Sequence, residues 1–332
     1  MTTNNNNIFE ILKAQLYQAP LPEKLKADMM RNLMKLKNQK VNIMITGATG
    51  VGKSSTINAL FNAEKAKVGI GVDPETMTIT RYELDNLILW DTPGLGDGKE
   101  ADMCHAKNIV KKLHECDSDG KALIDLVLVI LDGSSRDLGT SYELINSVII
   151  PNLGPNKEQR ILVAINQCDV AMKGRYWNYE ENRPEPQLEA FLDEKVQSVR
   201  RRIREGTGVD IEPIYYSAGW QDGNEKQNPY NLTKLLYYII EHTPEEKRLV
   251  YAQNMSEKTE VWKTNDNLKN YSAEVKSRFT ETLRHGIVAG AATGATIGTF
   301  FGGPVGAAVG GAIGGIVGGM VGAIGNFLSK IF

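Results

Sequence analysis

A glycine-rich loop with a lysine and a serine is the part of this sequence best suited to chemistry. It reads GATGVGKS, a complete GxxxxGK[ST] pattern, and directly follows the apolar run VNIMIT. Glycines let backbone amides close around phosphate groups, and the start of a following helix adds a favourable dipole. The lysine can reach the β- and γ-phosphates, and the serine hydroxyl can ligate Mg²⁺. We therefore expect phosphate contacts from Gly47, Ala48, Thr49, Gly50, Val51, Gly52, Lys53, Ser54 and Ser55.

A second motif concerns the metal ion. Asp91 and Gly94 belong to the run DTPG, which follows the apolar residues LILW. Asp91 can hold Mg²⁺ through a water molecule, and the Gly94 amide can contact a γ-phosphate. Together with the Ser54 hydroxyl, this motif predicts a Mg²⁺ site beside the phosphates.

A third motif addresses the base. The run NQCD, which follows the apolar residues ILVAI, contains Asn166, Gln167 and Asp169 and resembles the guanine motif NKxD with glutamine in place of lysine. Asp169 can accept hydrogen bonds from the ring nitrogen and the exocyclic amine of guanine, two donors that adenine does not present in that arrangement. A buried carboxylate left without those donors is costly, so this residue favours guanine over adenine.

The elements that must position these motifs follow from the hydrophobic pattern. Short β-branched runs alternate with helical stretches, which favours an α/β fold around a mostly parallel sheet. We predict six strands, at 41–46, 78–84, 87–91, 125–132, 160–166 and 211–216. We predict helices at 53–62, 100–116, 139–150, 187–205 and 230–242.

The ordered motifs over residues 47–218 resemble those of TRAFAC-class G proteins. The likeness is greatest to the Era-like, prophage-associated GTPases of bacteria, and looser to septins, plastid outer-envelope import GTPases and vertebrate immunity-related GTPases. It implies a Ras-like P-loop fold that binds GTP with Mg²⁺, in which the γ-phosphate orders two switch segments. Ser217 and Ala218 match the fifth motif of such proteins, whose backbone contacts the guanine oxygen.

The first switch segment and the catalytic group are harder to place. Thr76 is favoured as the switch threonine and Mg²⁺ ligand because it precedes the second strand, with Thr78 as the alternative. Leu95 follows DTPG where Ras-like enzymes carry a water-orienting glutamine, so slow hydrolysis is expected. The loop has Gly50 where potassium-stimulated relatives have asparagine, so a potassium-activated mechanism is not supported either. By elimination, the missing catalytic group comes from a partner or from a second copy of the chain.

Composition sets the class of protein and the compartment. The chain has 332 residues and a formal charge of −2, which gives no electrostatic reason to expect nucleic acid as a partner. Its three cysteines show no CxxC spacing, so a reducing, cytoplasmic location is expected.

Four regions are predicted along the chain. Residues 1–38 contain two helices separated near Pro20 and Pro22, and 39–243 form the G domain. Residues 244–285 are charge-rich and predict a helical stalk of one or two long helices, which packs beside the N-terminal pair. The polar stretch 173–186 is predicted as a surface loop, and 286–332 form a glycine-rich tail.

The tail carries glycine at ten positions with an unbroken spacing of four, from Gly286 to Gly322, in a stretch without charge. Each interior glycine costs a helix in water about 1 kcal/mol relative to alanine, whereas in lipid this spacing lets helices approach closely. The tail resembles a glycine zipper, interrupted near Pro304. The resulting segments, 286–301 and 305–328, span about 24 and 36 Å against a hydrocarbon core of about 30 Å. The second is long enough to cross a membrane and the first is marginal.

These observations favour a slow, nucleotide-dependent GTPase switch. We expect it to bind GTP, to form a homodimer or oligomer, and to associate through 286–328 with the cytoplasmic face of a bacterial membrane. Packing of the glycine-rich helices on the protein's own domains is the alternative for the tail. Two other functions stay open: a toxin-like or defence effector that perturbs membranes when its G domain triggers it, and an Era-like ribosome-assembly factor. No RNA-binding module follows the G domain, which weakens the last.

Overall fold

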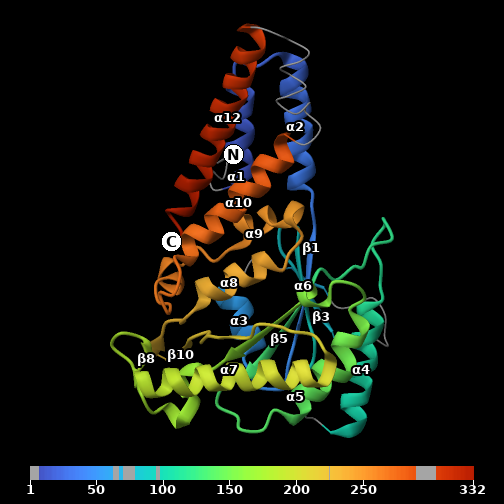
Figure 1. Ribbon diagram of the computed structural model, residues 1–332, viewed down its shortest axis with the longest axis vertical. Coiled ribbons are helices and arrows are strands. Elements are labelled where there is room, and N and C mark those ends of the chain that lie inside the picture. Colours follow the sequence, from blue (N-terminus) through green and yellow to red (C-terminus); the bar gives the residue numbers. More distant parts are fainter. Residues whose placement is uncertain (1–6, 63–66, 70–78, 95–97, 224, 289–303) are drawn as a thin grey trace. The chain divides into compact units, whose positions relative to one another are not determined.

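The computed structural model describes residues 7–62, 67–69, 79–94, 98–223, 225–288 and 304–332 (Figure 1). The chain divides into two compact units. The first consists of Met1–Lys40, Pro244–Gln253 and Ser272–Phe332, and the second of Val41–Thr243 and Asn254–Tyr271.

The second unit is built on a seven-stranded sheet with the order β2-β3-β4-β1-β5-β6-β9. Its strands are β1 (Val41–Thr46), β2 (Lys67–Gly69), β3 (Thr80–Glu83), β4 (Leu87–Asp91), β5 (Leu126–Asp132), β6 (Ile161–Asn166) and β9 (Ile214–Tyr215). The five strands from β4 to β9 are parallel, and β3 and β2 are antiparallel to their neighbours. The predicted α/β class and mostly parallel sheet are confirmed, and β2 adds a strand at the edge beyond the six expected.

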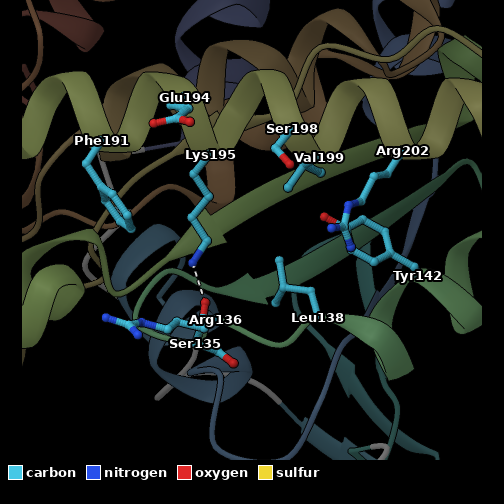
Figure 2. Close-up of a pocket in the computed structure, with 10 residues that line it drawn as sticks. All are labelled: Ser135, Arg136, Leu138, Tyr142, Phe191, Glu194, Lys195, Ser198, Val199 and Arg202. Atoms are coloured by element: carbon cyan, nitrogen blue, oxygen red, sulfur yellow. Dashed lines mark hydrogen bonds between the residues drawn. The ribbon is translucent and has the colours of Figure 1, made fainter.

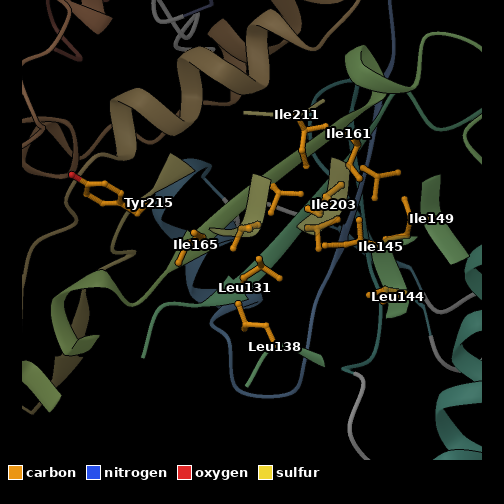
Figure 3. Packing of buried hydrophobic residues seen from close by; sticks show 14 of the residues in the cluster. Leu131, Leu138, Leu144, Ile145, Ile149, Ile161, Ile165, Ile203, Ile211 and Tyr215 are labelled. Atoms are coloured by element: carbon orange, nitrogen blue, oxygen red, sulfur yellow. The ribbon is translucent and has the colours of Figure 1, made fainter. Parts of the chain in front are cut away.

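Helices cover both faces of this sheet. They are α3 (Lys53–Leu60), α4 (Lys99–Leu113), α5 (Gly139–Glu143), α6 (Lys157–Arg160), α7 (Pro186–Thr207) and α8 (Leu232–Glu241). Alternate residues of β5 and β6, such as Leu131 and Ile165, pack in one hydrophobic cluster with α7 (Figure 3), and residues of α4 belong to the same cluster. Because side chains alternate along a strand, the intervening residues face the opposite side, where α8 contacts β6 and α3.

Two local predictions need correction. The helix expected at 139–150 changes after α5 into a π-helix, Leu144–Ile149, and then a 3₁₀ turn, Ile150–Asn152, where Pro151 has no N–H to continue the α-helical ladder. The predicted surface loop 173–186 contains a hairpin of β7 (Trp177–Asn178) and β8 (Arg183–Pro184). Trp177 anchors it because its buried ring packs edge-on against Tyr230. A second hairpin pairs β10 (Trp220–Asp222) with β11 (Glu225–Gln227).

The first unit is helical. It contains α1 (Ile8–Gln18), α2 (Glu23–Lys37), α9 (Leu249–Asn254), α10 (Tyr271–Val288) and α12 (Pro304–Leu328). Each long helix buries apolar residues at spacings of three and four, which places them on one face. These buried residues are Phe9, Leu12 and Leu16 in α1, Met29, Leu33 and Leu36 in α2, Val275, Phe279 and Leu283 in α10, and Met320, Ile324 and Leu328 in α12.

The segment predicted as a stalk differs from expectation at its centre. Residues 254–270 form no long helix, and their longest helical piece is the 3₁₀ turn Thr259–Trp262. They belong to the second unit because Asn62 N donates to Asn254 O (3.1 Å) and Ser256 N to Leu60 O (2.9 Å). Backbone groups bonded to the end of α3 in this way cannot also form an α-helix.

The glycine-rich tail is described only in part, because 289–303 lie outside the described residues. Its second segment is the helix α12, which contacts α1. Gly286 lies in α10, where an added Cβ would meet the Leu36 side chain at 2.6 Å. Among the helices that the structure describes, none combines the length and hydropathy needed to cross a membrane, contrary to the expectation for 305–328.

Candidate functional site

The phosphate loop begins where β1 ends, and its shape depends on glycine. β1 is buried along its whole length and lies between β4 and β5. At Gly47 the backbone has φ 146°, and a Cβ there would overlap the carbonyl oxygen of Ile130 in β5. Gly52 has φ 86° and directly precedes α3. A side chain is excluded at the first position by overlap and strained at the second, so the loop turns from strand to helix as a phosphate loop requires.

The loop closes on itself through its lysine. Lys53 Nζ donates to the carbonyl oxygens of Gly47 (3.1 Å) and Ala48 (3.0 Å). Ser54 and Ser55 are exposed in the first turn of α3, where the N–H groups of a helix start have no intrahelical acceptor. The loop thus combines an ammonium group, the N–H groups of a helix start and exposed hydroxyls, which is chemistry suited to an anion with an attached cation.

Asp91 ends β4 next to this loop. It pairs in register with Ile45 of β1, and one carboxylate oxygen, Oδ1, is buried and has no hydrogen-bond partner. Burial raises the pKa of Asp91 from 3.8 to about 6, against the opposing effect of Lys53. An orphaned carboxylate oxygen of this kind fits a Mg²⁺ ion, which prefers oxygen ligands and retains several waters. Gly94, three residues on, packs so closely on Thr49 that a Cβ would overlap it.

Asn166 connects three loops. Its Nδ2 donates to Val51 O in the phosphate loop (2.8 Å), and its Oδ1 accepts from Ala218 N (3.0 Å). Its own carbonyl oxygen accepts from Gly133 N at 2.7 Å. Gln167, at φ 60°, donates from Nε2 to Gly50 O at 3.0 Å. The predicted phosphate and base motifs are thus joined directly, because amide side chains bridge their backbones.

Asp169 and the pair Ser217–Ala218 lie near each other, because Cys168 N donates to Tyr216 O (3.3 Å) and Ala218 N to Asn166 Oδ1. Asp169 is 4% exposed, and no described residue donates a hydrogen bond to its carboxylate. Ser217 exchanges two backbone hydrogen bonds with Tyr230, both at 3.0 Å, and is 3% exposed. A buried carboxylate beside a fixed backbone turn can select a ring with two adjacent donors.

The structure adds one contact that sequence reasoning missed. Thr56 of α3 donates to Gly52 O and also shares a hydrogen bond of 2.6 Å with Tyr216 Oη. Burial raises the pKa of Tyr216, so its phenol stays neutral. No motif pairs these residues, which lie 160 positions apart. Three predicted positions, Thr76, Thr78 and Leu95, lie outside the described residues.

Comparison with known proteins agrees with this arrangement. Residues 42–167 match the sequence model of the family described as 50S ribosome-binding GTPase. This match supports the Ras-like P-loop GTPase fold for these residues. The matched segment runs from β1 to the first residues of the guanine motif, so the model covers the phosphate loop and DTPG.

Two curated relatives match parts of this chain. An uncharacterized Escherichia coli protein, YkfA, is 29% identical over 170 residues, which are 50% of this chain and 55% of the relative. The mouse interferon-inducible GTPase 1 is 37% identical over 70 residues, which are 19% of this chain and 17% of the relative. The chain thus spans about half the length of the first relative and under a fifth of the second.

Solved structures of GTPases are similar at low identity. Toc33 from Arabidopsis thaliana, in complex with GDP and Mg²⁺, is 16% identical with a TM-score of 0.40, covering 73% of this chain and 98% of that one. The bacterial dynamin GTPase LeoA from ETEC is 13% identical with a TM-score of 0.39, covering 88% of this chain and 48% of that one.

Proposed function

We propose that the second unit binds GTP and GDP with Mg²⁺ and hydrolyses GTP slowly. The observation that carries the proposal is the buried Asp169 carboxylate, which has no donor among the described residues and lies in a motif that Asn166 ties to the phosphate loop. In this proposal Lys53 and the loop amides hold the phosphates, and Ser54, Asp91 and Thr76 hold Mg²⁺, Asp91 through a water. Gly94, with Thr76 or Thr78, contacts the γ-phosphate.

Replacing the carboxylate of Asp169 by an amide tests the base preference. Asn in place of Asp169 has the same shape but presents an amide, which donates as well as accepts. We expect Asp169→Asn to lose GDP affinity by about a hundredfold, because about two charge-assisted hydrogen bonds disappear. The same variant should gain affinity for xanthosine diphosphate, whose ring carries a carbonyl acceptor where guanine has an amine donor.

Competition against a fluorescent GDP analogue would measure both affinities. A gain for the xanthosine nucleotide also shows that the variant is folded. Unchanged GDP affinity in Asp169→Asn, or equal binding of ADP and GDP by the unaltered protein, would contradict guanine selection by this residue.

Slow hydrolysis is proposed because the residue after DTPG is leucine, which cannot orient a water molecule. A second copy of the chain, meeting the first across the nucleotide, would then supply the missing group. Hydrolysis per molecule should rise with protein concentration over about a hundredfold range, as expected when the active species is a dimer. A flat specific activity would remove the requirement for self-association and leave the GTP proposal intact.

The glycine-rich tail is proposed as the part that assembles, at the cytoplasmic face of a membrane. Supporting this, Gly314, Gly315, Gly318, Gly319 and Gly322 of α12 have open space where a side chain would stand. A glycine-lined helix face lets another helix approach closely, in lipid above all. The nucleotide state would govern whether this face is used.

Flotation with anionic liposomes tests the membrane part of the proposal. Full-length protein loaded with GTP should float, whereas the truncation 1–285 should stay at the bottom of the gradient. In Lys53→Ala, nucleotide control is removed, so the fraction of protein that floats should be the same with GTP and with GDP. Equal recovery of full-length protein and truncation in the lipid fraction would rule out membrane association through the tail.

A further inference from the structure

A pocket of about 400 Å³ lies on the second unit, between one face of α7 and the segment 135–142 that follows β5. Phe191, Lys195, Ser198 and Arg202 line it from α7 at spacings of three and four, which places them on one side of that helix (Figure 2). None of its lining residues belongs to the phosphate, DTPG, NQCD or Ser217–Ala218 motifs. The pocket is therefore separate from the proposed nucleotide site.

The floor and walls of the pocket are largely apolar. Leu138 and Val199 are buried, and Phe191 and Tyr142 are partly buried against the hydrophobic cluster of the sheet. In Figure 2 the Leu138 and Val199 side chains point toward each other in the middle of the group, with Phe191 at one end and Tyr142 at the other. These side chains offer an organic molecule a surface about three helical turns long.

Cations surround this apolar surface. Lys195 Nζ donates to the carbonyl oxygens of Gly133 and Ser135, each at 2.6 Å, and the second bond is the dashed line in Figure 2. Burial lowers the pKa of Lys195, against the opposing effect of Asp132. The two hydrogen bonds hold the Lys195 ammonium at the rim of the pocket before any ligand arrives, which reduces the entropy lost on binding.

Two arginines complete the positive lining. The Arg202 guanidinium lies 5.3 Å from the centre of the Tyr142 ring, and Arg136 is exposed on the opposite wall. Neither forms an ion pair with a carboxylate of the described residues. Glu194 is the acidic member of the lining, and its carboxylate points away from the Lys195 ammonium in Figure 2.

We propose that this pocket is a second ligand site, which takes a small organic anion with an apolar, aromatic body. Its volume lies within the range of about 300–1,000 Å³ that is usual for small-molecule sites, and it combines apolar walls with few, converging polar groups. Arg202 holds the anionic head, the Ser198 hydroxyl offers a further hydrogen bond, and Leu138 with Phe191 packs against the ring system (Figure 2). Arginine suits this role because its planar fork binds phosphate or carboxylate oxygens in pairs.

The test uses 1-naphthyl phosphate as the probe, with calorimetric titration of the full-length protein. The protein is first saturated with GDP and Mg²⁺, so that the phosphate loop is occupied. We expect one saturable site per chain, and the uncharged 1-naphthol should bind at least about tenfold more weakly because it cannot pair with Arg202. A parallel titration with 1-naphthoate shows whether the site prefers a phosphate or a carboxylate head.

Matched variants on one helix locate the site. Arg202→Glu should weaken the probe at least about tenfold, whereas Arg201→Glu, one residue earlier and exposed outside the pocket, should leave its affinity unchanged. Ser198→Phe, which fills the pocket without altering charge, should also abolish binding. Thermal melting confirms that each variant is folded. Equal affinities for 1-naphthyl phosphate and 1-naphthol, or equal losses in the Arg202 and Arg201 variants, would overturn the proposal.

Discussion

The buried carboxylate of Asp91 allows a prediction in which one substitution acts in opposite directions on stability and on metal binding. Its pKa is raised from 3.8 to about 6, mainly by burial. Above pH 6 the native state must carry an ionised group that the unfolded chain solvates better. At about 1.4 kcal/mol per pKa unit, this ionised carboxylate destabilises the nucleotide-free protein by about 3 kcal/mol near pH 7.5.

Asp91→Asn removes this charge while keeping the shape of the side chain. Without nucleotide and with a chelator present, the variant should therefore be more stable by about 2–3 kcal/mol, which corresponds to about 5–10 °C for a unit of this size. All four tryptophans, Trp90, Trp177, Trp220 and Trp262, lie in the second unit, so their fluorescence follows its unfolding alone.

The pH dependence has a definite sign. A raised native pKa contributes stability that is present below 3.8 and lost as pH rises through about 6. The advantage of Asp91→Asn over the unaltered protein should therefore shrink by about half between pH 7.5 and pH 5, to roughly 1.5 kcal/mol. Asp85→Asn, an exposed carboxylate in the β3–β4 turn of the same sheet, is the matched control and should change stability by less than about 0.5 kcal/mol.

With GTP present, the effect of the substitution on stability should run in the opposite direction. Mg²⁺ should add stability to the unaltered protein and little to Asp91→Asn, because a neutral amide replaces the carboxylate that we propose as its partner. The reasoning would be refuted if Asp91→Asn were no more stable than the unaltered protein in chelator, or if its advantage did not depend on pH.

Three further substitutions test the packing around the site. Gly47→Ala should prevent folding of the second unit or cost it more than about 3 kcal/mol, because its Cβ would overlap Ile130 O; tryptophan fluorescence at rising urea would show this. Tyr216→Phe should cost about 1 kcal/mol in the same assay, since it removes the 2.6 Å hydrogen bond to Thr56. Lys234→Ala should cost about 3 kcal/mol, because the Asp266 carboxylate, whose side chain is 1% exposed, would lose its ion-pair partner at 2.7 Å and keep only the neutral donors Leu268 N and Tyr271 Oη; a loss below about 1 kcal/mol would contradict it.

The parts of the site that sequence could predict are those formed by neighbours along the chain. The phosphate loop needs one strand, one turn and one helix start in succession, and glycine spacing encodes that turn locally. β5 and β6 are continuous apolar runs that are buried at nearly every residue, which is likewise a local pattern, so the sheet was predictable apart from the three-residue edge strand β2. Such a short strand carries almost no periodic signal.

Contacts between distant segments were not predictable in this way. The Asn166 bridge to Val51 and Ala218 joins residues 115 and 52 positions apart, and a motif reveals the residue but not the geometry of its partners. The hairpin at 177–184 was predicted as a loop because its strands are two residues long and depend on Trp177 packing against Tyr230. Tertiary packing, rather than local propensity, decides such elements.

The segment 254–256 shows how the two units are joined by the chain itself. Asp85 N donates to Asn254 Oδ1 (3.1 Å) and Asn254 Nδ2 donates to Asp85 O (2.8 Å), so this side chain is held at the β3–β4 turn. Asn62 Nδ2 donates to Met255 O at 2.9 Å, and residue 62 directly precedes the segment that contains the proposed switch threonines. The chain passes between the two units at 253–254, so these hydrogen bonds fix the second unit's residues directly after that point.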